Sequence, residues 1–333
     1  MINQRSRSGL TIIEILVSLS IIGLLMALLV PAVQSAREAS RRVQCQSRLK
    51  EMALALNSFE ATRAEFPSAL TPWPGSNPVQ SDWFYAPHVR LLPYLDQTAL
   101  YRRFDLKRTQ LFVGDPRTLD EFQNARIEAF LCPSDPVIAG TNYRVCMGPG
   151  PYETTSALMP GGGSGAFSAG QVFRPSDFRD GMANTIALSE KLKSPGLLAG
   201  YTPEMFWYSG VANLGVPFPA LDDMVTNCGA LSGVPNEFFP FVGGTWFITG
   251  YEYTSYNHAV TPNNETPDCS VQSTASSTST NGGVFKASSH HSGGVHCAFM
   301  DGHTKFVSNF TDLRVWRGLS TRVGGEPLSD SSF

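Results

Sequence analysis

The sequence predicts an α+β protein in which a long N-terminal helix precedes a β-rich globular body. The first observation is an almost continuous apolar run from Leu10 to Val33, which an amphipathic helical pattern follows directly. The second is the abundance of turn formers, since 30 Gly and 23 Pro in 333 residues favour a β or α+β body over a helical bundle. The third is a strong hairpin signal near the C-terminus, at Asp301-Gly302.

The apolar run is long enough to cross a bilayer, and Arg5 and Arg7 before it predict a cytoplasmic N-terminus and an exported remainder. A cleaved secretory signal and a plain signal anchor both fit this pattern, because residues 30–32 loosely match a small-residue cleavage site. Neither explains Glu14, since a carboxylate at membrane depth costs about 2.5 kcal/mol or more on insertion scales.

The helix is expected to continue from Leu10 to about Thr62, with Gly23 and Pro31 as its weak points. Its second half carries one apolar stripe with spacings of four and three residues, which should pack on the body. The stripe consists of Cys45, Leu49, Met52, Leu56 and Phe59. Cys45 can therefore meet a cysteine of the body or remain a buried thiol.

The body is predicted to contain one interrupted helix and several short strands. Pro93 breaks an amphipathic helix over residues 88–105. Residues 270–283 are a low-complexity serine and threonine tract, which predicts a mobile loop. Strands are expected in residues 125–136 (ending in a Pro-Ser-Asp-Pro turn), 143–150, 180–192 (a strand or a short helix after a turn) and 243–263.

Asp301-Gly302 predicts a two-residue hairpin turn because both turn positions need a positive φ. This register opposes Phe299 to Thr304 and Cys297 to Phe306. One face of the hairpin is then mostly apolar and the other mostly polar or small, as a half-buried antiparallel hairpin requires.

The remaining composition excludes several classes of function. A net charge of −3 gives no electrostatic footprint for nucleic acid. The sequence holds neither Gly-x-Ser-x-Gly nor His-Glu-x-x-His, so hydrolase chemistry finds no support and no enzyme is predicted. The six cysteines contain no C-x-x-C pair, which disfavours zinc and thioredoxin-like sites and favours disulfides in an oxidising compartment.

The histidines near the C-terminus do not predict a zinc site. His296 and His303 share a face of the predicted hairpin but lie too far apart to share a metal. His290 and His291 lie in the preceding Ser-Gly loop, and His291 is expected to fix that loop by hydrogen bonding. Trp246, Tyr251 and Tyr253 fit either an exposed glycan-binding surface or core strands.

The segment Gly9 to Glu14, GLTIIE, resembles the type IV prepilin leader. The resemblance implies that a prepilin peptidase cuts after Gly9 and methylates the new amine on Leu10, where the usual residue is Phe. It also implies that Glu14 faces the positive N-terminus of a neighbouring subunit in a filament, because a paired charge is tolerable in apolar surroundings.

Blocks along nearly the whole chain resemble a large bacterial family with this N-terminus and an exported domain of unknown function. The tail motif of that family is a histidine, nine residues, then Asp-Gly, which matches His291, Asp301 and Gly302. The other matching blocks are Arg41, Arg42, Cys45, Leu49 and Lys50; residues 92–95; residues 132–135; Asp180 to Glu190; residues 256–269; and Trp316 to Glu326. The family looks like type II secretion pseudopilins with an enlarged head, which implies a pilin-like fold: a long helix on an antiparallel sheet with inserted β structure.

The resemblance implies four regions: a leader (1–9), a transmembrane half of the helix (10–33), an exported amphipathic half (34–62) and a periplasmic or extracellular head (63–333). It implies an assembly subunit of a type II secretion or type IV pilus-like system in the bacterial inner membrane, or at the cell surface after assembly. The expected partners are a prepilin peptidase, other pseudopilins or copies of itself, and inner-membrane secretion components. The alternative is an anchored binding module for glycans or solutes.

Two disulfides are favoured. Cys45–Cys132 would tie the helix to the family's Cys-Pro-Ser-Asp turn, and Cys228–Cys269 would close a long loop. Cys146 and Cys297 would then stay free or pair with each other. No cofactor is expected apart from calcium, which pseudopilins can hold in a C-terminal loop; the candidate ligands are Asp135, Asp180 and Asp301.

Overall fold

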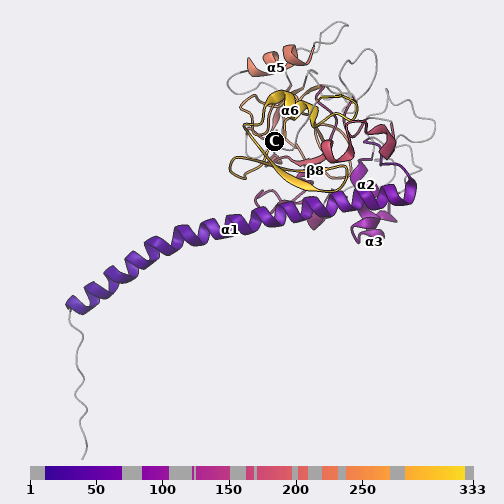
Figure 1. The fold of residues 1–333 in the computed structure, drawn as a ribbon. Helices are drawn as coiled ribbons and strands as arrows, with labels where there is room; N and C mark the ends of the chain where they lie inside the picture. Colours follow the sequence, from indigo (N-terminus) through magenta and orange to yellow (C-terminus); the bar gives the residue numbers. More distant parts are fainter. Residues whose placement is uncertain are drawn as a thin grey trace, which may run out of the picture. The chain divides into compact units, whose positions relative to one another are not determined.

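The computed structural model describes ten stretches of the chain (Figure 1). The chain divides into two compact units, residues 1–43 and residues 44–333. The described residues are 12–69, 85–104, 122–123, 125–150, 163–168, 171–196, 202–208, 220–231, 238–270 and 282–326.

Helix α1 spans Ile12–Arg63, close to the predicted end at Thr62, and it continues through both Gly23 and Pro31. In the first unit of the chain, the apolar side chains of α1 from Ile12 to Val33 are exposed. Among the described residues this helix is the one that is long and apolar enough to cross a membrane, judged by length and composition. The structure therefore agrees with an apolar helix of membrane-spanning length.

In the second unit, the last part of α1 packs on the body through the predicted stripe. Cys45, Leu49, Met52 and Leu56 are buried in the main hydrophobic core. Phe59 is half-buried against the same core. The four-and-three spacing thus identified the buried face of this part of the helix.

The main sheet has five strands in the order β5-β1-β2-β8-β9. Neighbouring strands are antiparallel except β1 and β5, which are parallel, so the sheet is mixed where a purely antiparallel one was expected. The α+β class is confirmed. The strands are β1 (Tyr143–Cys146), β2 (Ile186–Glu190), β5 (Ser255–Tyr256), β8 (Gly294–Phe299) and β9 (Thr304–Ser308).

Both faces of this sheet are covered. Ala298 and Met300 join the core beneath the end of α1. Val295 and Cys297 point into a second core. Helix α6 (Leu313–Gly318) contributes Trp316 to that second core.

A second, smaller sheet has the order β4-β3-β6-β7, with β3 and β6 parallel. Its strands are β3 (Phe206–Tyr208), β4 (Phe238–Phe239), β6 (Cys269–Ser270) and β7 (Gly283–Val284). Helix α5 (Leu221–Gly229) is joined to β6 by the Cys228–Cys269 disulfide.

The interrupted helix is present as predicted. It consists of α2 (Pro87–Leu91), a 3₁₀ turn η1 (Leu92–Tyr94) that contains Pro93, and α3 (Thr98–Tyr101). Three further 3₁₀ turns are η2 (Glu128–Phe130), η3 (Pro175–Asp177) and η4 (Met182–Asn184). The turn-then-strand prediction for residues 180–192 matches η4 followed by β2.

The strand predicted in residues 125–136 is wrong. The described part of this segment forms the 3₁₀ turn η2 and a loop. Its backbone groups bond within the turn, to the Asn142 amide and to side chains instead of forming a strand ladder: the Cys132 amide donates to Asn142 Oδ1, and the Leu131 carbonyl accepts from Arg48.

The hairpin forms, but its register is one residue away from the predicted one. Cys297 pairs with Lys305 and Ala298 pairs with Thr304. The Gly302 amide donates to the Phe299 carbonyl, and Gly302 has a φ of 92°. The connection is therefore a three-residue loop with a left-handed glycine, which shifts every cross-strand pair.

The expected half-buried hairpin is correct only for β9, four of whose five residues are partly or fully exposed, because β8 is buried along its whole length between β2 and β9. In the aromatic segment 243–263, regular strand is limited to β5, and the rest is mostly turns. Trp246, Tyr251 and Tyr253 are buried, so they do not present a glycan-binding surface. Most of the predicted loop 270–283 lies outside the described residues.

Candidate functional site

The predicted processing site falls partly outside the described residues, which begin at Ile12 and so exclude Gly9 and Leu10. Glu14 lies in the first turn of α1. Its backbone carbonyl accepts a hydrogen bond from the Ser18 hydroxyl at 2.7 Å. Glu14 is thus held on a regular helix, four positions after the predicted new N-terminal residue in the sequence.

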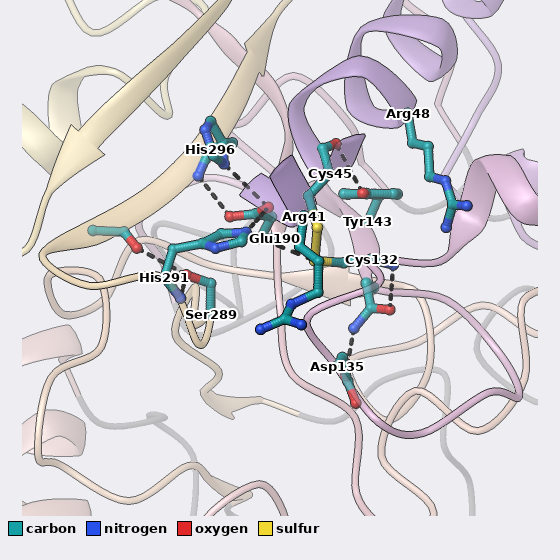
Figure 2. Close-up of polar contacts among 12 residues, drawn as sticks. Arg41, Cys45, Arg48, Cys132, Asp135, Tyr143, Glu190, Ser289, His291 and His296 are labelled. Carbon is teal, nitrogen blue, oxygen red and sulfur yellow. Dashed lines mark hydrogen bonds and ion pairs between the residues drawn. A yellow bond between two sulfur atoms is a disulfide. The ribbon is translucent and has the colours of Figure 1, made fainter. Parts of the chain in front are cut away.

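A buried polar cluster forms in the second unit around Glu190, the last residue of β2. Glu190 Oε1 accepts from His296 Nδ1 at 3.2 Å and from His291 Nε2 at 3.3 Å. Glu190 Oε2 accepts from the His296 backbone amide at 2.8 Å. Figure 2 shows the carboxylate between the two imidazole rings. The Glu190 carboxylate therefore joins the end of β2, the neighbouring strand β8 and the loop before β8.

The environment of Glu190 favours its charged form. Burial alone would raise the pKa of this carboxyl, but the hydrogen bonds and charges of His291 and His296 outweigh it and hold the pKa below the usual value. The geometry therefore describes a carboxylate stabilised by N–H donors in a dry interior.

The Cys45–Cys132 disulfide lies directly beside this cluster, with Cys132 Sγ 3.7 Å from His291 Nε2 (Figure 2). Cys45 comes from α1 and Cys132 from the loop after η2. The Tyr143 hydroxyl donates to the Cys45 carbonyl at 2.8 Å. The end of α1, the loop, β1 and the Glu190 cluster thus meet at one buried point.

Asn142 and Asp135 organise the loop that carries Cys132. Asn142 accepts from the Cys132 amide through Oδ1 and donates to Asp135 Oδ2 through Nδ2. Asp135 also accepts from the backbone amides of Val137 and Lys193. The family's Cys-Pro-Ser-Asp block is therefore a turn whose polar groups are bonded within the protein.

The three aspartates named as calcium candidates lie in different places. Asp180 accepts from the backbone amides of Gly324 and Gly325 and so holds the C-terminal segment. Asp301 accepts from the backbone amide and Nδ1 of His303. Asp135 lies in the turn described above. Their carboxylates accept hydrogen bonds from N–H groups and, at Asp180, also from the Thr321 hydroxyl, and calcium stays a prediction from the sequence.

The histidines divide into different roles. The shifted register places His303 opposite Phe299, on whose ring it stacks, whereas His296 is opposite Phe306. The prediction that His296 and His303 share a face is therefore wrong. His290 is exposed, and His291 is buried and hydrogen-bonded, as the sequence suggested for the loop before the hairpin.

Both favoured disulfides, Cys45–Cys132 and Cys228–Cys269, are formed, and Cys146 and Cys297 are buried free thiols. Sequence reasoning missed Glu190 as the partner of His291 and His296. The available signal was an acidic residue at the end of the apolar strand segment Ile186–Glu190, which requires a buried partner.

Comparison with known proteins gives two family matches and one relative. Residues 34–314 match the family described as protein of unknown function (DUF1559), and residues 4–30 match the prokaryotic N-terminal methylation motif. Type II secretion system core protein G of Pseudomonas aeruginosa is 32% identical over 96 residues, which are 27% of this chain and 68% of that protein. No solved structure matches the chain.

The N-terminal match covers the predicted cleavage position after Gly9, Glu14 and most of the apolar run of α1. The longer match contains every residue of the Glu190 cluster and both disulfides. The chain therefore belongs to the DUF1559 protein family, in a pseudopilin-like form that begins with a prokaryotic N-terminal methylation motif.

Proposed function

We propose that the protein is an assembly subunit of a type II secretion or type IV pilus-like system, made as a precursor that a prepilin peptidase cuts after Gly9. The observation that carries this proposal is the coincidence of three features at the N-terminus. These are the methylation-motif match over residues 4–30, Glu14 in the first turn of α1, and an apolar helix of membrane-spanning length.

Glu14 acts as an assembly device in this proposal. Cleavage after Gly9 creates a positive amine on Leu10, and the Glu14 carboxylate of one subunit pairs with that amine on a neighbour. A carboxylate among apolar side chains is costly, and a neighbouring charge of opposite sign offsets much of that cost. Glu14 thus favours the assembled state over the isolated helix.

The subunit resides in the inner membrane with its N-terminus cytoplasmic and its head in the periplasm, and it reaches the surface only if the assembled filament does. Its partners are the prepilin peptidase, other pseudopilins or copies of itself, and the inner-membrane secretion components. The similarity to a core protein of a type II secretion system supports these partners. The role is mechanical, and the covalent chemistry on the chain is done by the peptidase.

Affinity capture of the full chain from membranes tests this function. The wild-type chain is expected to co-purify with pseudopilins or with tagged copies of itself. Glu14→Ala should insert in the membrane but lose this capture by about tenfold or more, because the charge pair is gone. Ser18→Ala, one turn further along the same apolar run, is the matched control and should keep it.

Equal capture of the Glu14→Ala and wild-type chains would contradict the role of Glu14. Capture of neither pseudopilins nor copies of itself by the wild-type chain would contradict the assembly function as a whole.

A further inference from the structure

Four metal-ligand side chains converge at the buried junction of α1, β2 and the two loops. Cys45, Cys132, Glu190 and His291 each offer one ligand atom, and these atoms all lie within 4.8 Å of one another. All four residues are buried. They come from distant parts of the chain, so the fold itself assembles them (Figure 2).

Two of the separations already match a tetrahedral zinc site. Zinc bonds of about 2.0–2.3 Å place tetrahedral ligand atoms about 3.3–3.8 Å apart. His291 Nε2 lies 3.3 Å from Glu190 Oε1 and 3.7 Å from Cys132 Sγ. The two sulfur atoms are joined in the structure, and they would have to separate to about 3.8 Å to complete the tetrahedron.

The surrounding groups hold these ligands as the outer partners of a metal site do. His296 donates to Glu190 through its ring and its backbone amide, which fixes the carboxylate. Asn142 holds the backbone of Cys132, and Tyr143 holds the carbonyl of Cys45. Such supporting hydrogen bonds orient ligands and strengthen metal binding.

We propose that the reduced protein binds one Zn²⁺ through Cys45, Cys132, Glu190 and His291, and that zinc and the Cys45–Cys132 disulfide are alternative ways of closing the same junction. The donor set of two thiolates, one imidazole and one carboxylate suits zinc better than calcium or magnesium, which prefer oxygen ligands. Four protein ligands in a buried position make this a structural site, with no coordination position left for a substrate.

The two states differ by one electron pair and its protons. A dithiol reductant gives two electrons and two protons to the disulfide, which yields two thiols, and the dithiol becomes a disulfide. Zinc then displaces one proton from each thiol and the Nε2 proton of the His291 ring, whose other nitrogen carries the remaining proton. Reoxidation by a disulfide oxidant moves two electrons from the thiolates to that oxidant, which takes up two protons and becomes a dithiol; the Cys45–Cys132 disulfide reforms, Zn²⁺ is released, and His291 Nε2 takes its proton back from water.

Both closures join α1 to the loop after η2. Zinc would join these two also to β2 and to the loop before β8. A newly exported chain that has not been oxidised would therefore hold its helix on the head through the metal. This inference concerns the second unit, residues 44–333, and is independent of the proposed processing and assembly.

Zinc binding to the full-length chain in detergent tests the proposal. The chain is reduced with a phosphine, freed of reductant without oxygen, and titrated with Zn²⁺ and, separately, with Co²⁺. The expected result is about one Zn²⁺ per reduced chain and a Co²⁺ absorption spectrum with tetrahedral and thiolate charge-transfer bands. The oxidised chain should show neither.

Matched variants separate this site from the other cysteines and histidines. His291→Ala should weaken zinc binding at least about a hundredfold, and the exposed neighbour His290→Ala should leave it unchanged. The double variant Cys228→Ser/Cys269→Ser should retain the site, and Cys45→Ser/Cys132→Ser should lose it.

Alkylation mapping of the wild-type chain gives an answer that does not depend on whether the variants fold. Bound zinc should protect Cys45 and Cys132 from alkylation and leave Cys228 and Cys269 as reactive as in the metal-free reduced chain. The proposal is overturned if the reduced chain binds no zinc, if zinc protects another pair, or if the oxidised chain binds zinc equally well.

Discussion

At the residue scale, Glu190 is the centre of the buried polar cluster of the second unit. It is a buried carboxylate whose N–H donors come from His291 and His296. When a buried charge loses a partner, the free-energy cost of keeping that charge away from water is no longer compensated. The stability of the oxidised chain is therefore sensitive to the loss of His291.

His291→Ala should destabilise the oxidised full-length chain by about 3 kcal/mol, because Glu190 loses a buried donor. Fluorescence of the buried Trp246 and Trp316 during denaturation measures this change. His290→Ala, at the exposed neighbouring position, should change stability by no more than about 0.5 kcal/mol. Equal effects of the two substitutions would show that the Glu190 contact contributes no stability.

Two other histidines predict an acid sensitivity of the fold. Burial lowers the pKa of His88 from 6.5 to about 4 and that of His258 to about 3. Below pH 6.5 these histidines are therefore protonated in the unfolded chain but stay neutral in the folded chain. Their contribution to the free energy of unfolding is complete above pH 6.5 and decreases as the pH falls toward 4.

Denaturation at a series of pH values checks this sign and window. Each unit of pKa difference contributes about 1.4 kcal/mol of pH-dependent stability. His88→Asn can still donate to the Tyr143 carbonyl that His88 Nε2 contacts, and it removes the titrating group. It should reduce the slope of the profile between pH 6.5 and 4 and leave the part due to His258, and an unchanged slope would show that His88 does not titrate in this way.

The pairing of Glu190 with His296 could not be predicted from the sequence, because 106 positions separate the two residues. The sequence did identify His291 as a hydrogen-bonding residue of its loop. Its partner became visible only when the sheet order placed β2 beside β8. Long-range contacts of this kind depend on topology, which local patterns do not encode.

At the element scale, the end of α1 is fixed on the β8–β9 turn. Lys50 Nζ donates to the Gly302 carbonyl at 2.5 Å, and Gln46 contacts Thr304. A side-chain Cβ at Gly302 would lie 2.6 Å from Asn57 Nδ2 of the same helix. The glycine of the family's tail motif therefore serves both the turn and the approach of the helix.

Gly302→Ala should destabilise the protein by more than Gly293→Ala. Both glycines have positive φ, so each substitution costs about 1–2 kcal/mol of backbone strain, but nothing lies within 4 Å of a Cβ at Gly293. The difference between the two variants measures the Asn57 contact. It should disappear in an Asn57→Ala background, and a difference that persists there would contradict this explanation.

The elements divide clearly into those that local patterns predicted and those that they did not. The stripe from Cys45 to Leu56 located the buried face of α1, since helical periodicity is a local property. The hairpin was located correctly at Asp301-Gly302, but its register depends on whether the loop has two or three residues, which the dipeptide does not specify. The segment 125–136 looked like a strand, but Arg48 and Asn142 bond its backbone instead.

At the scale of the whole molecule, the structure of the first unit could be predicted from the sequence more completely than that of the second. The described part of the N-terminal unit lies in one helix, whose sequence and motif agree with its proposed role. The head combines two mixed sheets, short 3₁₀ turns and two disulfides, and most of its strands have two to five residues. Short strands carry little periodic signal, so the head could be assigned to a class but not to a topology.

The central claim is that the N-terminal segment is a prepilin leader. Intact-mass analysis and N-terminal sequencing of the full chain, extracted from membranes that contain a prepilin peptidase, test it most directly. The account predicts a chain that begins at Leu10 with a methylated amine. A chain that still begins at Met1, or one that begins at Val33 after signal-peptide cleavage, would contradict it.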